Sequence, residues 1–598
     1  LLARDFFDEK NLPQETYDLI IGNPPWVSRK KTATATATRW CKTRSLPMPA
    51  NELAWAFVWR ALELVKKPQG LTAFLLPAMG MLLNLEDGPI AARKIWLARV
   101  RLHRVVNLAD TSFLLFEGAK RPTVLCLYTP ASGDAQNYTF EYWCPKASRF
   151  LGYARMLALT NSDKVVLSSS KVIQDPRTWS RHQWTANRDL KLLDWLGTLP
   201  KLNERLVTYR DSLKKGFSKT GKRWIIGQGF QPAQPENIGK KGYHTERLPI
   251  LNQLPYMPAT DIGSLVAPNV EGSRVDSNLV RRKGYVEGFS APHVLIPQGI
   301  ERRSGLLRAV YSEQPCCFQH SLQAIRFPAE DAPWLKLLTA VLNSKFTAWY
   351  LFHETGNLGA DRAKVHEWEL GELPFPMPED LANPNAARKA VDEIVVVMDE
   401  LLRNKDRLLA AQRDVNERLD ALVYAYYGLS GDEIAVVEDT VKYVIASMQP
   451  RLRRQTPPLW ITSRQEHWQA YANTLSEAVE RWLKSDFGIE TAAVGASQDL
   501  VVLRLTMRHG KPTQRFQQQL ATEGMTQLLA RIHAALPRKL SRNLMLIPDL
   551  RVFLDNDLYI VKPRAMRYWL RSAALNDADG IVEELFSNSM DQGRRKNN

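Results

Sequence analysis

The first 80 residues alternate between short apolar runs and a longer segment whose apolar residues recur at helical spacing. Residues 17–22 and 71–77 are apolar runs that end in a glycine and a proline, and such runs are typical of buried parallel strands. Residues 51–67, which lie between them, predict an amphipathic helix. The apolar side of this helix carries Trp55, Val58, Trp59, Leu62 and Val65.

The same alternation continues to about residue 130. Residues 89–101 predict a second helix, and residues 104–108 and 123–128 predict two more strands. Strands and helices in strict succession favour an α/β fold with a doubly wound sheet. Residues 30–39 interrupt the pattern with alternating Thr and Ala between basic residues, and this low complexity predicts a mobile surface loop.

Beyond residue 130 the pattern first weakens and then changes in character. Short strand-like runs separated by Gly, Pro and Asn turns occupy residues 224–378 and predict a strand-rich domain. Residues 385–420 are charged, lack Gly and Pro, and predict a long helix that packs on a neighbour or folds into a hairpin. We expect the chain to divide at 1–135, 136–213, 214–380, 381–450 and 459–590, with a linker at 450–458 and an α+β fold in the last part.

Charge and cysteine content narrow the class of protein. The 598 residues hold 80 Lys and Arg against 63 Asp and Glu, and this net charge of +17 favours a polyanionic partner. Nucleic acid is the commonest such partner, and a membrane surface is the alternative. No apolar run approaches the roughly 20 residues that span a bilayer, and residues 1–10 lack a signal-peptide pattern. Five cysteines without paired spacing argue against disulfides or a structural zinc site, and they fit the cytoplasm.

The chemical centre of the sequence is Asn23-Pro24-Pro25-Trp26, directly after the first predicted strand. An exocyclic amino group on a base is a poor nucleophile because its lone pair is delocalised into the ring. The side-chain oxygen of Asn23 and the carbonyl of Pro24 are uncharged acceptors that can hold such an amino group toward a methyl donor. The prolines stiffen the loop, and Trp26 offers a flat face for an extruded base. The expected catalytic residues are therefore Asn23, Pro24, Pro25 and Trp26.

Residues 18–26 resemble motif IV of the gamma-class DNA amino-methyltransferases, which include type I modification subunits and type IIG restriction-modification enzymes. The resemblance covers about residues 1–435. It implies site-specific DNA adenine-N6 methylation from S-adenosylmethionine, in a restriction-modification or phage-defence system. It also implies an α/β fold: a partial Rossmann-like methyltransferase sheet, then a mixed α/β target recognition domain at 214–380, a long-helix unit and a C-terminal α+β region.

The family's motif III is similar to residues 3–7, which implies that Asp5 and Phe6 bind the adenine end of S-adenosylmethionine. Residues 113–124 resemble a later segment whose aromatic residue packs on the extruded adenine, a role that falls to Phe116. The family's glycine-rich motif I and acidic motif II, which precede motif III, have no counterpart in this chain. We therefore expect a fragment or one half of a split enzyme, which is inactive alone.

The target recognition domain implies a double-stranded DNA partner, beside possible restriction or defence subunits. Such domains read base edges in the groove while Lys and Arg hold the phosphates. No metal site is expected, because the sequence lacks clustered His, Cys or acidic residues with ligand spacing. The candidates for DNA contact are Lys214, Lys215, Lys219, Lys222, Arg223, Arg281, Arg282, Lys283, Arg302 and Arg303.

Two other readings stay open at this point. One is a non-catalytic DNA-recognition subunit, either a truncated remnant or half of a split enzyme. The other is methylation of a different amino acceptor, namely cytosine N4, RNA adenine or a protein glutamine, since an amide nitrogen has the same delocalised lone pair. Glutamine methyltransferases are short, so the long basic region favours a nucleic acid.

Overall fold

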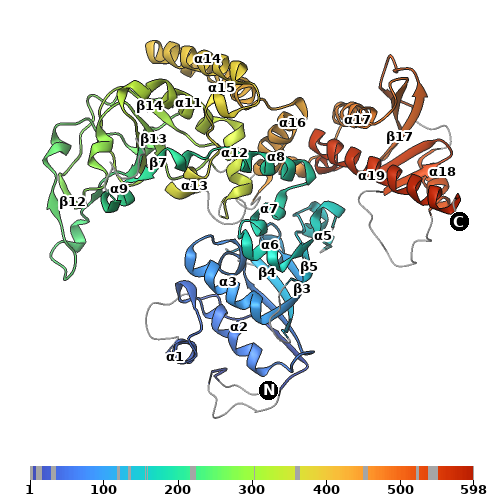
Figure 1. Cartoon of the computed structure of the whole chain (residues 1–598), viewed down its shortest axis with the longest axis horizontal. Coiled ribbons are helices and arrows are strands. Elements are labelled where there is room, and N and C mark those ends of the chain that lie inside the picture. The colour runs from blue at the N-terminus through green and yellow to red at the C-terminus, as the bar shows by residue number, and fades with distance from the viewer. Residues whose placement is uncertain are drawn as a thin grey trace. The chain divides into compact units, whose positions relative to one another are not determined.

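The computed structural model describes residues 5–7, 16–27, 35–116, 121–131, 137–154, 156–157, 159–215, 224–301, 304–356, 358, 364–448, 456–519, 524–536 and 550–596. The chain divides into two compact units (Figure 1). The first unit consists of Leu1–Arg188, Gly359–Asp361 and Ser447–Asn598, and the second of Asp189–Leu358 and Arg362–Ala446. Among the described residues, no helix has both the length and the apolar character needed to cross a membrane.

The first unit opens with a mixed six-stranded sheet in the order β1-β2-β4-β3-β5-β6. β1 and β2 are parallel, whereas β4 runs antiparallel between β2 and β3. The ends of β1, β2 and β3 and the start of β4 therefore lie along one edge of the sheet. The strands are β1 (Leu19–Gly22), β2 (Leu71–Pro77), β3 (Val100–Asn107), β4 (Thr123–Pro130), β5 (Thr139–Trp143) and β6 (Lys164–Ser168).

Helices α2 (Leu53–Leu64) and α3 (Asp87–Arg99) pack on the same face of this sheet. The Trp55 ring of α2 lies 6.4 Å from the Trp96 ring of α3, which lies 5.5 Å from the Tyr128 ring on β4. Right-handed crossovers that proceed in one direction across a sheet place their helices on one face. The expected α/β fold is confirmed, but the expected doubly wound arrangement is wrong for these strands.

The position of β1 corrects a second expectation. β1 is parallel to β2 as predicted, but it lies at the edge of the sheet and is not buried. The side chains of Leu19 and Ile21 are 51% and 74% exposed, because they point to the face opposite α2 and α3. An apolar run is thus not sufficient to distinguish a central strand from an edge strand.

The region that was expected to form a mobile loop is partly helical. Helix α1 (Ala35–Thr43) begins within residues 30–39, and residues 28–34 lie outside the described part of the chain. Alternating Ala and Thr contain no Gly or Pro, so nothing in the repeat prevents a helix. Trp40 of α1 packs near Phe7, with ring centroids 5.7 Å apart, which anchors the helix.

Shorter helices and a second α+β layer complete the first unit. The helices are α4 (Ser112–Leu115), α5 (Arg149–Ala154), α6 (Ser169–Gln174) and α7 (Thr178–Trp184). The C-terminal part has the expected α+β character, with a five-stranded sheet in the order β18-β16-β17-β20-β19. Its elements are α17 (Gln465–Glu480), β16 (Phe487–Ala496), β17 (Leu500–His509), β18 (Phe516–Gln518), α18 (Gly524–Ala534), β19 (Leu550–Leu554), β20 (Asp557–Pro563) and α19 (Arg571–Lys596).

The second unit is rich in strands, as the turn spacing predicted. A six-stranded sheet has the order β11-β14-β13-β15-β8-β7, and a three-stranded ribbon has the order β10-β12-β9. Val280 of the ribbon and Leu295 of the sheet belong to one buried cluster, so the ribbon is packed on the sheet. The strands are β7 (Leu206–Thr208), β8 (Trp224–Gln228), β9 (Gln231–Pro232), β10 (Glu246–Arg247), β11 (Leu265–Val266), β12 (Leu279–Arg282), β13 (His293–Pro297), β14 (Val310–Ser312) and β15 (Leu322–Arg326).

The long helical pattern folds as a hairpin. α14 (Pro384–Arg403) and α15 (Lys405–Tyr427) are separated at Asn404, and they pack on each other. α15 ends at Gly428, whose φ of +71° suits a residue without a Cβ atom. The other helices of this unit are α8 (Asn187–Gly197, whose first two residues belong to the first unit), α9 (Tyr209–Lys215), α11 (Ala332–Asn343), α12 (Lys345–Glu354), α13 (Glu367–Gly371) and α16 (Gly431–Asp439).

Candidate active site

The loop Asn23–Trp26 leaves β1 at the edge of the sheet where β2 and β3 also end. A Cβ atom on Gly22 would lie 2.9 Å from Cε1 of Phe74, so β1 approaches β2 too closely there for a larger residue. Just beyond the loop, the carbonyl of Val27 accepts a hydrogen bond of 3.2 Å from the Leu53 N–H at the start of α2. The loop is therefore held at both ends, by a strand and by a helix.

The four loop residues differ in exposure in a way that suits their expected roles. Asn23 and Pro25 are exposed, Pro24 is buried, and Trp26 is half-buried. The amide of Asn23 is thus accessible to a substrate, while Pro24 anchors the backbone beneath it. The indole Nε1 of Trp26 is buried and donates no hydrogen bond to any residue that the structure describes.

Asp5 and Phe6, the expected cofactor residues, lie against the first two helices. The Asp5 carboxylate accepts hydrogen bonds from the Phe7 N–H and from Oγ1 of Thr36, both at 2.9 Å. Phe6 is half-buried and stacks on Phe57 of α2, with ring centroids 5.0 Å apart and planes at 3°. An exposed carboxylate beside a stacked aromatic ring fits the amino group and ring of an adenosyl group.

Phe116 lies on the same edge of the sheet as the loop. It follows the short helix α4 after β3, and its N–H donates to the carbonyl of Ser112 at 2.9 Å. The Ser112 hydroxyl accepts from the N–H of Thr123, the first residue of β4, at 3.2 Å. Phe116 is half-buried, and the structure describes no contact between it and Trp26.

A buried carboxyl at this edge was not anticipated from the sequence. Glu52 precedes α2, and a Cβ atom on Gly80, just after β2, would lie 1.8 Å from Oε2 of Glu52. That oxygen is buried and accepts no hydrogen bond from the described residues. Burial raises the pKa of the Glu52 carboxyl, and the charge of Arg121 opposes this shift. In the sequence an acidic residue before an apolar helix indicates only a helix start, so nothing there marks its burial.

Three of the expected DNA-contacting residues lie together on the ribbon of the second unit. Arg281 and Arg282 are on β12, Lys283 follows it, and all three are exposed. The Arg281 guanidinium lies over the Tyr243 ring, 5.0 Å from its centroid, and Lys283 pairs with Glu246 at 2.9 Å.

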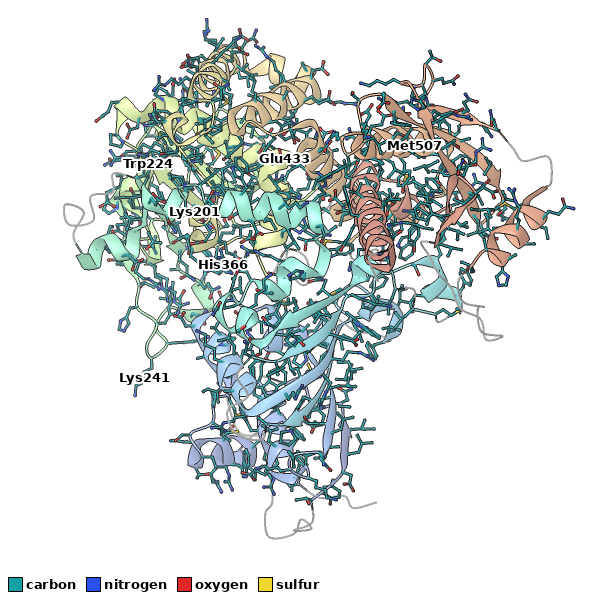
Figure 2. The ribbon with its side chains drawn as sticks, turned by 45° about the vertical axis from the view of Figure 1, so that its right-hand side comes forward. Lys201, Trp224, Lys241, His366, Glu433 and Met507 are labelled. Atoms are coloured by element: carbon teal, nitrogen blue, oxygen red, sulfur yellow. The ribbon has the colours of Figure 1, made fainter. Side chains whose placement is uncertain are left out.

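Sequence reasoning missed a basic turn on the same ribbon. Lys240 and Lys241 lie between Gly239 and Gly242, whose φ angles are +85° and +82°. Lys241 projects away from the ribbon (Figure 2). The signal was present as two lysines between two glycines, a pattern that predicts an exposed turn. These lysines extend the exposed basic surface of β12.

The remaining candidates for DNA contact are not placed. Lys219, Lys222, Arg223, Arg302 and Arg303 lie outside the described residues. Lys214 and Lys215 belong to α9, but their side chains are not described. Within the described part of the chain, no cluster of His, Cys, Asp or Glu could hold a metal ion. All five cysteines are buried and unbridged.

Comparison with known proteins identifies the class of the first domain. Residues 3–113, which include the loop and the strands around it, match the model of the Eco57I restriction-modification methylase family. This stretch is therefore similar to methylase domains of the restriction-modification type. No match was found among curated proteins.

Several solved structures that are similar to parts of this chain come from restriction-modification systems. The type IIG restriction endonuclease BpuSI shows 12% identity over 71% of this chain and 56% of its own, with a TM-score of 0.29. The type IIL restriction-modification enzyme MmeI, solved in complex with DNA, shows 11% identity over 72% and 57%, with a TM-score of 0.35. The M protein of the type I restriction enzyme EcoKI shows 17% identity over 23% and 26%, with a TM-score of 0.18. The chain thus spans just over half the length of the first two.

Proposed function

We propose that this chain is a site-specific DNA adenine-N6 methyltransferase of a restriction-modification or phage-defence system. The observation that carries the proposal is the loop Asn23–Trp26, which presents an exposed amide and a half-buried indole at the edge where β1, β2 and β3 end. In open α/β sheets ligands bind at such an edge, outside the carboxyl ends of the strands.

The loop supplies what methylation of an amino group requires. The Asn23 side-chain oxygen and the Pro24 carbonyl each accept a hydrogen bond from the exocyclic amino group of an extruded adenine. These bonds localise electron density on the nitrogen, which then attacks the methyl carbon of the sulfonium donor. As the nitrogen–carbon bond forms, the carbon–sulfur bond breaks, the thioether S-adenosylhomocysteine leaves, and the nitrogen loses one proton to water. Trp26 stacks on one face of the base, and Phe116 on the other.

S-adenosylmethionine supplies the methyl group as a sulfonium substituent. Asp5 accepts a hydrogen bond from the adenosyl amino group, and Phe6 flanks the adenosyl ring. Phe6 stacks on Phe57, one helical turn along α2 from Leu53, whose N–H holds the end of the catalytic loop. One turn of an α-helix rises about 5.4 Å, so α2 brings the cofactor residues and the loop to the same rim.

The second unit provides the contact with DNA. The exposed basic side chains of β12 and of the turn at residues 239–242 hold phosphates of double-stranded DNA. Restriction or defence subunits are further partners of such a system. DNA binding should weaken steeply with salt, because each phosphate contact releases counterions.

Replacing Asn23 tests the proposal directly. Asn23→Ala should lower the rate of methyl transfer to DNA at least about 100-fold, because it removes one preorganised acceptor. DNA affinity should change by less than about threefold, since the ribbon is in the other unit. Transfer is measured with radiolabelled S-adenosylmethionine, and affinity by fluorescence anisotropy.

The matched control is Asn269→Ala, which removes an exposed amide of the second unit. This variant should methylate DNA like the wild type. An Asn23→Ala protein with the wild-type rate, or a complete wild-type protein that binds DNA and transfers no methyl group, contradicts the proposal. The second outcome would instead favour a recognition subunit.

A further inference from the structure

Two buried polar atoms near the catalytic loop lack hydrogen-bond partners, and they are complementary. The indole Nε1 of Trp26 is a donor, and the carboxyl Oε2 of Glu52 is an acceptor. Neither makes a hydrogen bond with any residue that the structure describes. Buried polar groups are normally paired, so each unpaired one calls for an explanation.

The backbones that carry these two groups are joined. The carbonyl of Val27, one residue after Trp26, accepts a hydrogen bond of 3.2 Å from the N–H of Leu53, one residue after Glu52. Trp26 and Glu52 therefore each precede one partner of this hydrogen bond, at the edge where β1 ends.

Glu52 is also confined. Its carboxyl lies against the backbone of Gly80, where no Cβ atom could fit. The two residues before it, Ala50 and Asn51, have φ angles of +51° and +55°, which L-residues rarely adopt. Such backbone conformations persist only where the surrounding structure imposes them, and they cluster at functional sites. The carboxyl is thus held at a fixed place against Gly80.

We propose that Glu52 is a positioning residue for Trp26. When the target base enters the site, the indole N–H donates a hydrogen bond to the Glu52 carboxyl, and this bond sets the plane on which the base stacks. The inference rests on the proposed function and adds Glu52 to the residues that act in base capture. A bond that forms only with the base bound favours the extruded state over the free one, because it satisfies two groups that are otherwise unpaired.

The alternative role of Glu52 is purely structural. Arg121 lies close enough for its charge to act on the Glu52 carboxyl, so the pair could do no more than anchor the start of β4. In that case removing the carboxyl would lower the stability of the protein, and the size of this effect would not depend on which ring occupies position 26. The two roles therefore differ in whether the effects of positions 26 and 52 are coupled.

A double-mutant cycle distinguishes the positioning role of Glu52 from the structural role. The variants are Trp26→Phe, which keeps a ring and removes the N–H, Glu52→Met, which keeps length and removes the acceptor, and the combination. Base extrusion is measured as the fluorescence of 2-aminopurine placed at the target adenine of the methylated site. Each single change should lower the extrusion equilibrium about tenfold, and the double variant should be no worse than either single one.

Controls keep the test independent of folding and of the proposed function. Glu63→Met on α2 removes a carboxyl paired with Arg44 and Arg60, and it should leave extrusion unchanged. Glu52→Gln retains an acceptor and should restore part of the loss. Multiplicative losses of about 100-fold in the double variant, or no effect of Glu52→Met, overturn the inference. Failure of the wild type itself to extrude the base counts instead against the proposed function.

Discussion

Asn23 and Glu52 differ in how far their place at this site could be predicted from the sequence. Asn23 could be singled out from the sequence, because an amide followed by two prolines and an aromatic residue suits one kind of chemistry. Glu52 could not, because its burial depends on Gly80, 28 positions further along the chain, which meets it only through the pairing of β1 with β2. Whether a side chain can accept a hydrogen bond depends on its own chemistry, whereas whether it is buried depends on the fold.

Gly80 provides a prediction at this scale. Gly80→Ala should lower the free energy of unfolding by about 1–3 kcal/mol, because the new methyl group would collide with the Glu52 carboxyl. Gly88→Ala in α3 is the control, since a Cβ atom there meets nothing within 4 Å, and it should change stability by less than about 0.5 kcal/mol. Thermal unfolding followed by circular dichroism measures both. Equal midpoints for the two variants would show that the carboxyl moves aside without cost.

At the scale of elements, periodicity predicted the existence of β1, α2, β2, α3 and β3 within a few residues. It did not predict the order of the strands. β4 lies between β2 and β3, and it pairs with β2 through residues that are about 50 positions apart in the sequence, such as Phe74 and Cys126. No local sequence pattern indicates this strand order. For the same reason the sequence could not show that β1 is an edge strand with Ile21 exposed.

The hairpin of α14 and α15 shows a similar limit. The sequence from 385 to 420 has no Gly or Pro, yet the chain turns at Asn404, whose φ and ψ of −140° and 75° are not helical. Packing of the apolar side of α14 on α15 and α11 outweighs the helix propensity of one residue. The sequence left both a single helix and a hairpin open, and tertiary contacts decide between them.

Helix α13 gives an element-scale prediction about pH. The Glu369 carboxylate accepts a hydrogen bond from the His366 N–H at 2.8 Å, but burial raises the pKa of Glu369 to about 7. The folded state therefore holds a proton that the unfolded state loses near its usual pKa of about 4.5. Below about pH 4.5 the Glu369 carboxyl is neutral in both states, so its burial carries no charge penalty. The free energy of unfolding should fall by up to about 3 kcal/mol as the pH rises from 4.5 to 7.

Glu369→Gln should remove this fall, because a neutral amide keeps the acceptor and does not titrate. The quantity to measure is the difference in unfolding free energy between wild type and variant, from urea titrations at pH 4.5 and at pH 7.5. The variant should gain relative to the wild type at the higher pH. A difference that does not vary with pH would show that Glu369 titrates normally.

At the scale of the whole molecule, distant parts of the sequence join within the first unit. Arg567, after β20, donates a hydrogen bond of 2.6 Å to Oδ1 of Asp163, before β6. Lys146 lies 3.3 Å from the same carboxylate, and the three charged groups are largely withdrawn from solvent. These cations hold the pKa of Asp163 below its usual value despite burial. The C-terminal α+β part is thus tied to the domain that carries the loop Asn23–Trp26.

Arg567→Leu should destabilise the first unit by about 3 kcal/mol, since a buried carboxylate would keep only one of its two cations. Arg567→Lys preserves the charge and should lose less. Limited proteolysis and thermal unfolding report the effect, and the rate of cleavage should increase in the variant. If Arg567→Leu unfolds like the wild type, the contact makes no net contribution.

The proposed reaction is methylation of the amino nitrogen of an extruded adenine, with Asn23 as acceptor. The most direct measurement is mass spectrometry of nucleosides from unmodified DNA incubated with the complete protein and with S-adenosylmethionine that carries a trideuterated methyl group. We predict N6-trideuteriomethyladenine with the wild type and none with Asn23→Ala. Label on cytosine N4, on protein alone, or on adenine to the same extent in both proteins would contradict the account.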